Sequence, residues 1–547
     1  MRARAQPRRA RPCTLCIAAT ARAALSPLCA RAGGFDIIGS GRDKIETPEQ
    51  FAASRAHVES LRLDGLVVIG GDDSNTNAAL LAEYFAAHGV ACRVVGCPKT
   101  IDGDLKVPEA GLDISFGFDT ACKTYSELIG NICLDTLSSG KYYNFVRLMG
   151  RAASNITLEC ALQTHPTLTL LGEEVAARKQ NLASITEELV AVIVARAAAG
   201  KNYGVILVPE GLIEFVPEVS VLLKELNELL ATGAVEATPA TVGDALSPAS
   251  AALFAYLPAG IKKQLLAERD PHGNVQVSLI ETEKLLAELV AHELGRLRKL
   301  GRFAGTFSHQ SFFLGYEGRC GTPSDFDAAY CFALGATAAA LLAAGQTGMM
   351  SSVTNLGAPV EEWACGGVPL TVMMNIERRH GKDKPVIRKW LVDLKGAPFR
   401  AFVEARGRWA YADCFRCPGP IQLDTAPRTR DTPPPPGGSR VDPLCFTLAL
   451  ELADRAAPPH AAAGAPLTPP PVHDVAGHRS LCEGLLTTGL AALTPTDMQR
   501  VAICRAAHGI SDEEHYSVLA QLGCSAADWK GAEIRAAQVQ AHSSSSS

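Results

Sequence analysis

Two acidic segments, each directly after a run of apolar residues, carry the side chains best suited to chemistry in this chain of 547 residues. The first is Gly70-Gly71-Asp72-Asp73-Ser74. A helix start presents free backbone N–H groups that favour phosphate, but two adjacent aspartates would repel a bare anion. A carboxylate that holds Mg²⁺ resolves this conflict, because the cation and the helix terminus then share the phosphate oxygens. The alternative is an acidic turn with no ligand.

The second segment is Pro98-Lys99-Thr100-Ile101-Asp102-Gly103-Asp104, which supplies a cation, a hydroxyl and two carboxylates. In an extended backbone Asp102 and Asp104 would point the same way, so they could share a metal or divide the roles of general base and orienting group. Lys99 could neutralise charge on a transferring phosphoryl group. Alone, the segment could be a surface turn, but two such segments on consecutive units favour phosphoryl transfer.

The elements that must position these segments alternate between strands and helices. The apolar run 61–71 ends in glycines and predicts a buried parallel strand, and residues 77–89 and 90–96 predict a helix and a second strand. The alternation continues with a helix at 119–137, a strand at 143–149, a helix from 154, and strands at 167–171 and 202–208. Repeated βα units indicate parallel sheets, whose ligands lie beyond the carboxyl ends of the strands.

Composition divides the chain into six regions. We expect a basic leader at 1–33, an α/β region at 34–213, a helical insertion at 214–300, a second α/β region at 301–420, a proline-rich linker at 421–480, and a small helical module with a serine tail at 481–547. The leader is rich in arginine and alanine and precedes the first acid, Asp36. This composition is typical of a transit peptide, and the alternative is a truncated or misassigned start.

Charge and cysteine usage exclude several classes of function. Lys and Arg total 52 and Asp and Glu total 57, so no global field favours a nucleic acid or an anionic membrane. No apolar stretch approaches the roughly 20 residues that span a bilayer, which predicts no transmembrane helix. The cysteines are scattered through apolar segments, such as Cys122, Cys133, Cys160 and Cys331, which favours reduced, buried thiols. We expect a cytoplasmic protein, with organellar targeting by the leader as the alternative.

Six motifs together resemble the pyrophosphate-using branch of the phosphofructokinase superfamily. They are GGDDS, PKTIDGDL, GFDTA at Gly117, KYYNFVRLMGRAAS at Lys141, PEGLIEF at Pro209 and GYEGR at Gly315, in the family order. The resemblance covers about 34–420 and is greatest to the long, plant-like catalytic beta type. It implies an α/β, phosphofructokinase-like fold of two parallel-sheet Rossmann-like domains with a helical insertion. The C-terminal helical extension is predicted from the sequence pattern beyond residue 480. It also implies reversible, Mg²⁺-dependent phosphoryl transfer from pyrophosphate to the 1-hydroxyl of fructose 6-phosphate.

The resemblance assigns roles in the donor and catalytic segments. Asp72 is implied to hold Mg²⁺ and Asp102 to take the proton of the sugar hydroxyl, supported by Lys99, Thr100 and Asp104. Asp73 stands where ATP-using relatives have a small residue, and its carboxylate would repel the alpha-phosphate of ATP. An ATP donor would need a small residue at 73 and a neutral one at 99, and the sequence has neither. The implied pyrophosphate contacts are Gly70, Gly71, Ser74 and Arg42.

The same resemblance assigns the binding of the sugar phosphate. The implied contacts are Thr100, Ile101 and Asp102, then Met149, Gly150 and Arg151, then Glu210 as a hydroxyl acceptor, and Tyr316, Glu317, Gly318 and Arg319 at the 6-phosphate. Lys141 and Tyr142 resemble a pair that reaches the site of a neighbouring subunit. We therefore expect a homo- or hetero-oligomer, either a dimer or a tetramer, with a regulatory alpha-type subunit as the candidate partner in a hetero-oligomer.

The chain departs from the family pattern at its amino end. Family members begin with a strand and a loop of the type GG-x-(A/P)-P-G, and the first 33 residues contain neither. Two hypotheses follow: a working enzyme whose loop comes from another segment or a fuller chain, or a non-catalytic regulatory or assembly subunit. The intact Asp72, Lys99, Asp102 and Asp104 favour the enzyme.

Overall fold

The described part of the chain divides into two compact units. The computed structural model describes residues 41, 44–231, 238–266, 275, 279–379, 382–421, 444–456 and 512–530, and the single residues 479, 482, 483, 486, 501 and 532. Unit 1 comprises Met1–Cys97, Ala338–Ser351 and Pro369–Ile387, and unit 2 comprises Pro98–Thr337, Ser352–Val368 and Arg388–Ser547. Both units are discontinuous in the chain, unlike the contiguous regions drawn from composition, because strands distant in sequence complete each unit.

Unit 1 contains the strand-helix-strand arrangement predicted for its first segment. Helix α4 (Pro48–Ser60) precedes β1 (Gly65–Gly70), α5 (Asp72–Ala87) and β2 (Arg93–Pro98). Helix α5 begins five residues earlier than the predicted start at 77, with Gly71 as its N-cap. The two aspartates therefore lie in the first helical turn, where carboxylates are stabilised by the helix dipole.

A four-stranded sheet has the order β1-β2-β7-β8, in which β7 (Met349–Thr354) is parallel to β2 and β8 spans Ala364–Pro369. In unit 1, Val95 and Cys97 of β2 pack against Ala338 and Leu342 at the end of helix α16 (Asp325–Ala343). The antiparallel hairpin of β9 (Met374–Arg379) and β10 (Lys382–Ile387) packs on α5.

Unit 2 is built around a parallel sheet of order β4-β5-β3-β6. The strands are β3 (Tyr143–Leu148), β4 (Leu168–Thr169), β5 (Gly204–Pro209) and β6 (His309–Leu314). The first three confirm the strands predicted at 143–149, 167–171 and 202–208, whereas β6 lies in the region predicted only as α/β. Leu148, at the end of β3, is in register with Pro209 of β5 and Leu314 of β6. The residues that follow these three strands therefore emerge side by side at one edge of the sheet.

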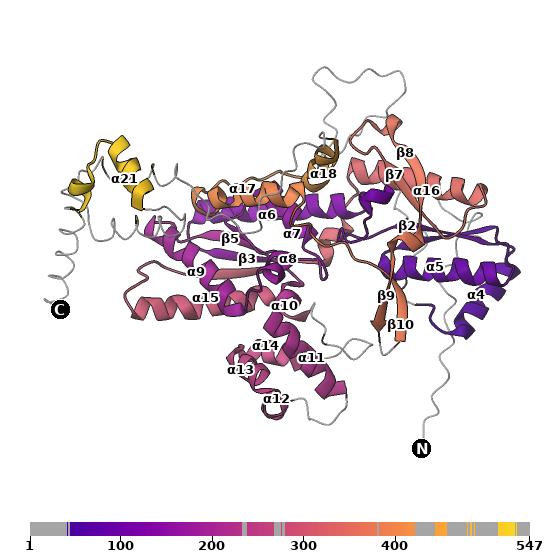
Figure 1. The fold of residues 1–547 in the computed structure, drawn as a ribbon, viewed down its shortest axis with the longest axis horizontal. Helices are drawn as coiled ribbons and strands as arrows, with labels where there is room; N and C mark the ends of the chain where they lie inside the picture. The colour runs from indigo at the N-terminus through magenta and orange to yellow at the C-terminus, as the bar shows by residue number, and fades with distance from the viewer. Residues whose placement is uncertain are drawn as a thin grey trace. The chain divides into compact units, whose positions relative to one another are not determined.

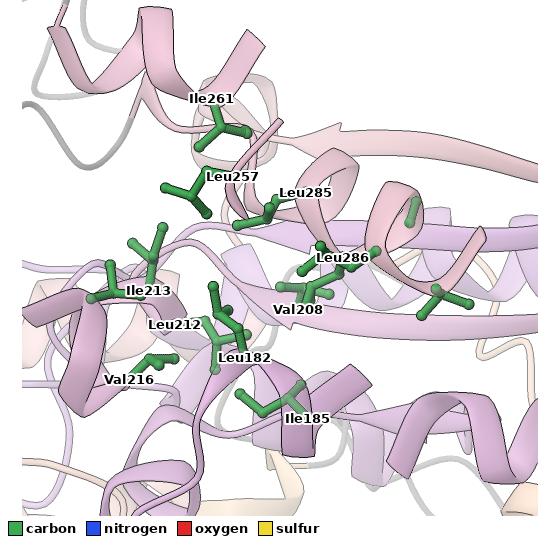
Figure 2. Close-up of a cluster of buried hydrophobic side chains, with 14 of the residues drawn as sticks. Leu182, Ile185, Val208, Leu212, Ile213, Val216, Leu257, Ile261, Leu285 and Leu286 are labelled. Carbon is green, nitrogen blue, oxygen red and sulfur yellow. The ribbon is translucent and has the colours of Figure 1, made fainter. Parts of the chain in front are cut away.

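Both faces of this sheet are covered by helices, as Figure 1 shows. Phe145 and Val208 belong to a core with α9 (Leu182–Ala198) and α15 (Thr282–Lys299), part of which is drawn in Figure 2. Val146 and Leu207 belong instead to a core with α6 (Phe118–Ser139), α7 (Asn155–Thr164) and α17 (Ala397–Ala412). Alternate strand residues point to opposite faces, so burial of both faces requires the continuous apolar runs seen in the sequence.

The region predicted as a helical insertion is helical but divides into two parts. Helices α11 (Pro217–Ala231), α12 (Pro239–Ala245), α13 (Pro248–Tyr256) and α14 (Ala259–Leu266) pack mainly on one another. Helix α15 packs instead on α9, β3 and β6. Helix α15 therefore belongs to the layer of helices that covers the sheet of unit 2.

The remaining described elements are short or lie towards the carboxyl end. They are α8 (Gly172–Ala177), α10 (Leu212–Phe215), α18 (Phe446–Ala456) and α21 (Asp512–Gln521), and the 3-10 helices Pro108–Ala110, Tyr316–Cys320, Val360–Glu362 and Leu370–Met373. Around α21, Val518, Leu519 and Trp529 form a small core with Cys482 and Val501. The predicted C-terminal module thus has a hydrophobic core of its own, whereas the leader and most of the linker lie outside the described residues.

Helix α16 corrects two expectations. It has 19 residues and a mean hydropathy of 1.6, so by length and composition it could cross a membrane, contrary to the sequence prediction. Its apolar character comes from an alanine-rich run, and Tyr330, Leu334 and Ala338 bury their side chains inside the protein. Cys331 on this helix is exposed, whereas Cys122 and Cys133 are buried free thiols as predicted.

Candidate functional site

The donor residues of unit 1 lie where β1 turns into α5. Gly70 ends the strand, Gly71 caps the helix, and Asp72, Asp73 and Ser74 form the first turn. The first-turn N–H groups of a helix have no partner within the helix, and the dipole makes this end attractive to anions. The turn can therefore hold a phosphate whose charge is offset by a cation at Asp72.

Asn75 fixes this turn, and sequence reasoning missed it. Its Nδ2 donates to the carbonyl oxygens of Gly70 at 2.6 Å and Gly71 at 2.9 Å, and its side chain is fully buried. One turn further along, Thr76 Oγ1 accepts a hydrogen bond from Ile387 N at 3.2 Å, which joins the hairpin to the helix. The only sequence signal was an amide two residues after the acidic pair.

The acidic pair has a basic neighbour. Lys44 Nζ lies 3.0 Å from Asp73 Oδ2, and both side chains are exposed. An exposed ion pair contributes little to stability, but it holds the Asp73 carboxylate beside the phosphate-binding turn. Arg42, the other predicted cation of this half, lies outside the described residues.

The residues fit Mg²⁺ held mainly by its substrate. Among the residues that the structure describes, no three His, Cys, Asp or Glu side chains gather into a metal site. Mg²⁺ is commonly bound through one or two carboxylates, with phosphate oxygens and water completing its coordination. Asp72, partly exposed at the phosphate-binding turn, has the donor atoms for that arrangement.

In unit 2, the predicted sugar-phosphate residues lie at the carboxyl edge of the sheet. Met149 follows β3, Glu210 follows β5 and Gly315 follows β6. Glu210 N donates to Leu148 O at 2.8 Å, and Gly211 N donates to Gly150 O at 3.2 Å. A side chain at position 211 would collide with the carbonyl of Arg151, so only glycine allows the two loops to come this close.

The acceptor loop, residues 99–105, is bent rather than extended. Gly103 has φ +66°, so the period-two argument that placed Asp102 and Asp104 on one side of an extended strand was wrong. Thr100 Oγ1 donates to Asp104 Oδ1 at 3.3 Å and accepts from Asp102 N at 3.1 Å. Asp104 is buried and lies 3.9 Å from Lys389 Nζ, whereas Asp102 is partly exposed. Of the two carboxylates, Asp102 is the more accessible to a substrate.

Asn155 and Trp390 hold the backbone of the acceptor loop, and neither was among the predicted site residues. Asn155 Nδ2 lies 3.2 Å from Asp102 O, 3.1 Å from Gly103 O and 3.4 Å from Trp390 O. Trp390 N donates to Asp104 O at 2.7 Å. Trp390 and its neighbour Lys389 are far away in sequence, and the only available signal was the position of Asn155 at the start of a predicted helix.

Glu210 is buried, and its carboxyl group interacts electrostatically with the predicted base, Asp102. Burial raises the pKa of its carboxyl group, the positive charges of Arg147 and Arg151 lower that pKa, and the Asp102 carboxylate raises it. Glu210 Oε2 is buried and has no hydrogen-bond partner among the described residues. The structure thus brings Asp102, Glu210 and Arg151 into one electrostatic cluster, with a buried acceptor suited to a substrate hydroxyl.

The loop after β6 presents a cation and an aromatic ring to solvent. Arg319 Cζ lies 4.4 Å from the centre of the Tyr316 ring, and both side chains are exposed. Tyr125 OH donates to Gly315 O at 2.7 Å, and the buried Gly318 lies against the Tyr125 ring. Glu317 turns back and accepts a hydrogen bond from Gly315 N at 3.0 Å, so it orders this loop.

Lys141 and Tyr142 lie at the opposite edge of the sheet. They precede β3, whereas Met149 follows it, and six strand residues span about 20 Å. The structure therefore does not bring this pair to the other sugar-phosphate residues of its own chain. That position agrees with the expectation that the pair serves a neighbouring subunit, which a single chain does not test.

Comparison with known proteins gives the family. The phosphofructokinase family model matches residues 20–342, more than half of the chain. The chain belongs to the phosphofructokinase family. This membership explains why the six motifs of the sequence analysis occur in the family order along the chain.

Similar phosphofructokinases come from plants and bacteria. The chain is 58% identical over 420 residues to pyrophosphate–fructose 6-phosphate 1-phosphotransferase subunit beta 1 of Arabidopsis thaliana. The aligned region covers 77% of this chain and 71% of that protein. It is 51% identical over 430 residues to the pyrophosphate–fructose 6-phosphate 1-phosphotransferase of Porphyromonas gingivalis, with 77% and 76% covered. Subunit alpha 1 of Arabidopsis thaliana is 45% identical over 402 residues, with 72% and 64% covered.

Proposed function

We propose that this chain is a catalytic subunit that transfers a phosphoryl group reversibly from pyrophosphate to the 1-hydroxyl of fructose 6-phosphate. The observation that carries this proposal is the acceptor loop of unit 2, where the partly exposed Asp102 is held by Thr100 and Asn155 beside the buried Glu210. A carboxylate fixed by its backbone and close to a hydroxyl acceptor is suited to proton abstraction from a sugar. The names of relatives at 51–58% identity support the same reaction.

In this mechanism Asp102 accepts the proton of the sugar 1-hydroxyl as the oxygen attacks one phosphorus atom of pyrophosphate. The bond from that phosphorus to the bridging oxygen breaks, and inorganic phosphate leaves. Glu210 accepts a hydrogen bond from another sugar hydroxyl, which orients the ring. Asp104 and Thr100 keep the acceptor loop in shape, and Lys99 offsets the charge that spreads over the transferring group. Most of the barrier reduction then comes from position and charge, as expected for phosphoryl transfer.

The remaining predicted residues bind the two ends of the substrates. The exposed guanidinium of Arg319, with Tyr316 beneath it, suits the 6-phosphate, because guanidinium groups bind phosphate through paired N–H bonds. Met149, Gly150 and Arg151 border the sugar from the neighbouring strand. On the donor side Asp72 would hold Mg²⁺, which when bound offsets the charge of pyrophosphate.

The carboxylate of Asp73 favours pyrophosphate over ATP. It stands on the first turn of α5 with Lys44 beside it, and a third phosphate group carrying a nucleoside would meet its negative charge. The names of the relatives from Arabidopsis thaliana and Porphyromonas gingivalis specify pyrophosphate as well.

A non-catalytic subunit is the second candidate, since the chain is also 45% identical to a protein named as an alpha subunit. The higher identity to the protein named beta 1, and the presence of Asp72, Lys99, Asp102 and Asp104, favour the catalytic assignment. We propose a dimer or tetramer in which Lys141 and Tyr142 complete a neighbour's site, with an alpha-type subunit as a possible partner. A cytoplasmic location is proposed from composition alone.

Substitution of the proposed base tests the function. We expect Asp102→Ser to lower turnover with pyrophosphate by at least about 1000-fold while fructose 6-phosphate still binds, because the base acts only in the transition state. Asp135→Ser, an exposed aspartate on α6, is the matched control and should keep full turnover. If Asp102→Ser retains turnover, or loses substrate binding to the same extent, the proposed role is wrong.

A further inference from the structure

Helix α18 contacts the segment that follows the acceptor loop. Lys106 of this segment and Glu451 of the helix are 345 residues apart in the chain. The Glu451 carboxylate forms an ion pair with Lys106, and Arg455 Nη1 lies 2.7 Å from Asp113 Oδ1. Lys106 and Asp113 bound the turn that follows Asp104. Their side chains are only 11% and 4% exposed, so water competes weakly for these charges. The helix is therefore tied to both ends of the segment that continues the loop.

The amino end of α18 is fixed independently. The buried Glu159 carboxylate accepts hydrogen bonds from Phe446 N at 2.8 Å and Thr447 N at 2.7 Å, which are first-turn donors of α18. A carboxylate at this end is favoured by the unpaired N–H groups and by the helix dipole. Leu448 is buried in the same core as Phe118. The helix therefore has a fixed position from which it can hold the loop.

The loop packs against Phe118 and Asn155 at Gly103, but part of it borders open space. A cavity of about 240 Å³ in unit 2 lies between the loop and α18. Its lining includes Gly103, Asn155 and Trp390 on the loop side and Leu448 and Glu451 on the helix side. Protein interiors normally resist displacement because they are closely packed, and on the side of the cavity the loop lacks that support. The polar ties to Asn155, Trp390 and α18 must then hold the loop in position.

We propose that α18 is a positioning strap for the acceptor loop, and that Lys106 and Glu451 are positioning residues for the reaction assigned above. The pair anchors the chain at Lys106, four residues after Asp102. Without it the loop can move into the cavity and carry the carboxylate away from the sugar hydroxyl. Displacement of a reacting group by about 1 Å can reduce the rate about 100-fold. The catalytic part of this inference rests on the proposed function, whereas the contact itself does not.

Two kinds of measurement on the full-length chain test the strap. We expect Lys106→Met and Glu451→Leu each to lower kcat at least about tenfold, with the KM for fructose 6-phosphate changed less than about twofold. The double variant Lys106→Glu, Glu451→Lys restores the pair in reverse and should recover most of the lost kcat. Asp454→Asn is the control on the same helix, since the pair of Asp454 with Arg400 is exposed, and it should leave kcat unchanged.

Hydrogen–deuterium exchange provides a readout that does not need activity. Glu451→Leu should speed the exchange of backbone amides in residues 99–113 at least about fivefold, and Asp454→Asn should not. Unchanged exchange in Glu451→Leu would overturn the inference, as would normal kcat in both single variants. A fall in kcat accompanied by a comparable rise in KM and by a lower melting temperature, none of which the reversed pair restores, would also overturn it. A wild-type chain without activity would refute the proposed function, while the exchange comparison would still decide whether the strap exists.

Discussion

Gly103→Ala should distort the acceptor loop without removing any catalytic group. Gly103 has φ +66°, where a residue with a Cβ costs about 1–2 kcal/mol. An added Cβ would also lie 2.8 Å from Phe118 Cε2 and 3.1 Å from Asn155 Cβ, both closer than normal contact. Overpacking of this kind costs about 1–3 kcal/mol, so the total strain is about 2–5 kcal/mol if the loop keeps its shape.

This strain must appear either in stability or in activity. If the loop keeps its shape, the free energy of unfolding falls by about 2–5 kcal/mol; if it relaxes into the neighbouring cavity, Asp102 moves and kcat falls. The assay combines denaturant unfolding with steady-state turnover on the same preparation. Gly200→Ala is the matched control, because Gly200 has φ +77° in the same unit but no atom within 4 Å of an added Cβ. The reasoning is refuted if the two variants have equal unfolding free energies and equal kcat.

Three further predictions concern the donor choice, the buried acceptor and the core. Asp73→Gly should make ATP a measurable donor in the turnover assay, since it removes the charge that opposes the alpha-phosphate; no gain would count against that role. Because burial raises the pKa of Glu210, its carboxylate takes up a proton as the pH falls, so the KM for fructose 6-phosphate should rise towards acid pH. Glu210→Gln should have a high KM with a flat pH profile, and a profile like the wild type would contradict this. Glu283→Gln should lower the unfolding free energy by about 3 kcal/mol, because it leaves the buried Arg147 without its carboxylate at 2.7 Å, whereas Glu293→Gln in an exposed pair should cost under about 1 kcal/mol.

Local pattern predicted the sheets well because burial on both faces leaves a clear signal. The apolar runs at β1 and β5 are continuous and end at glycine and proline, respectively, whereas β3 also contains the buried Asn144 and Arg147. The roles of Met149 and Glu210 came from the resemblance to the family, and the register of β3, β5 and β6 shows that these residues and Gly315 follow strands that end at one edge. The early start of α5 was missed because aspartate and glycine have low helix propensity, and the helix dipole outweighed it.

The supports of the site could not be predicted, since they depend on contacts between distant parts of the chain. Asn155 contacts a loop more than 50 residues before it, and Trp390 contacts Asp104 from almost 300 residues away. Neither leaves any periodicity in the sequence. The bend at Gly103 was also missed, because a glycine in a short polar segment fits an extended chain equally well.

The donor preference of the purified full-length chain tests the central claim most directly. We would measure formation of fructose 1,6-bisphosphate from fructose 6-phosphate and Mg²⁺, with pyrophosphate or ATP, and compare wild type with Asp102→Ser. We predict turnover with pyrophosphate, little or none with ATP, and loss of the pyrophosphate reaction in the variant. Equal turnover with the two donors, or no turnover with either from folded protein, would contradict the assignment of this chain as a pyrophosphate-dependent catalytic subunit.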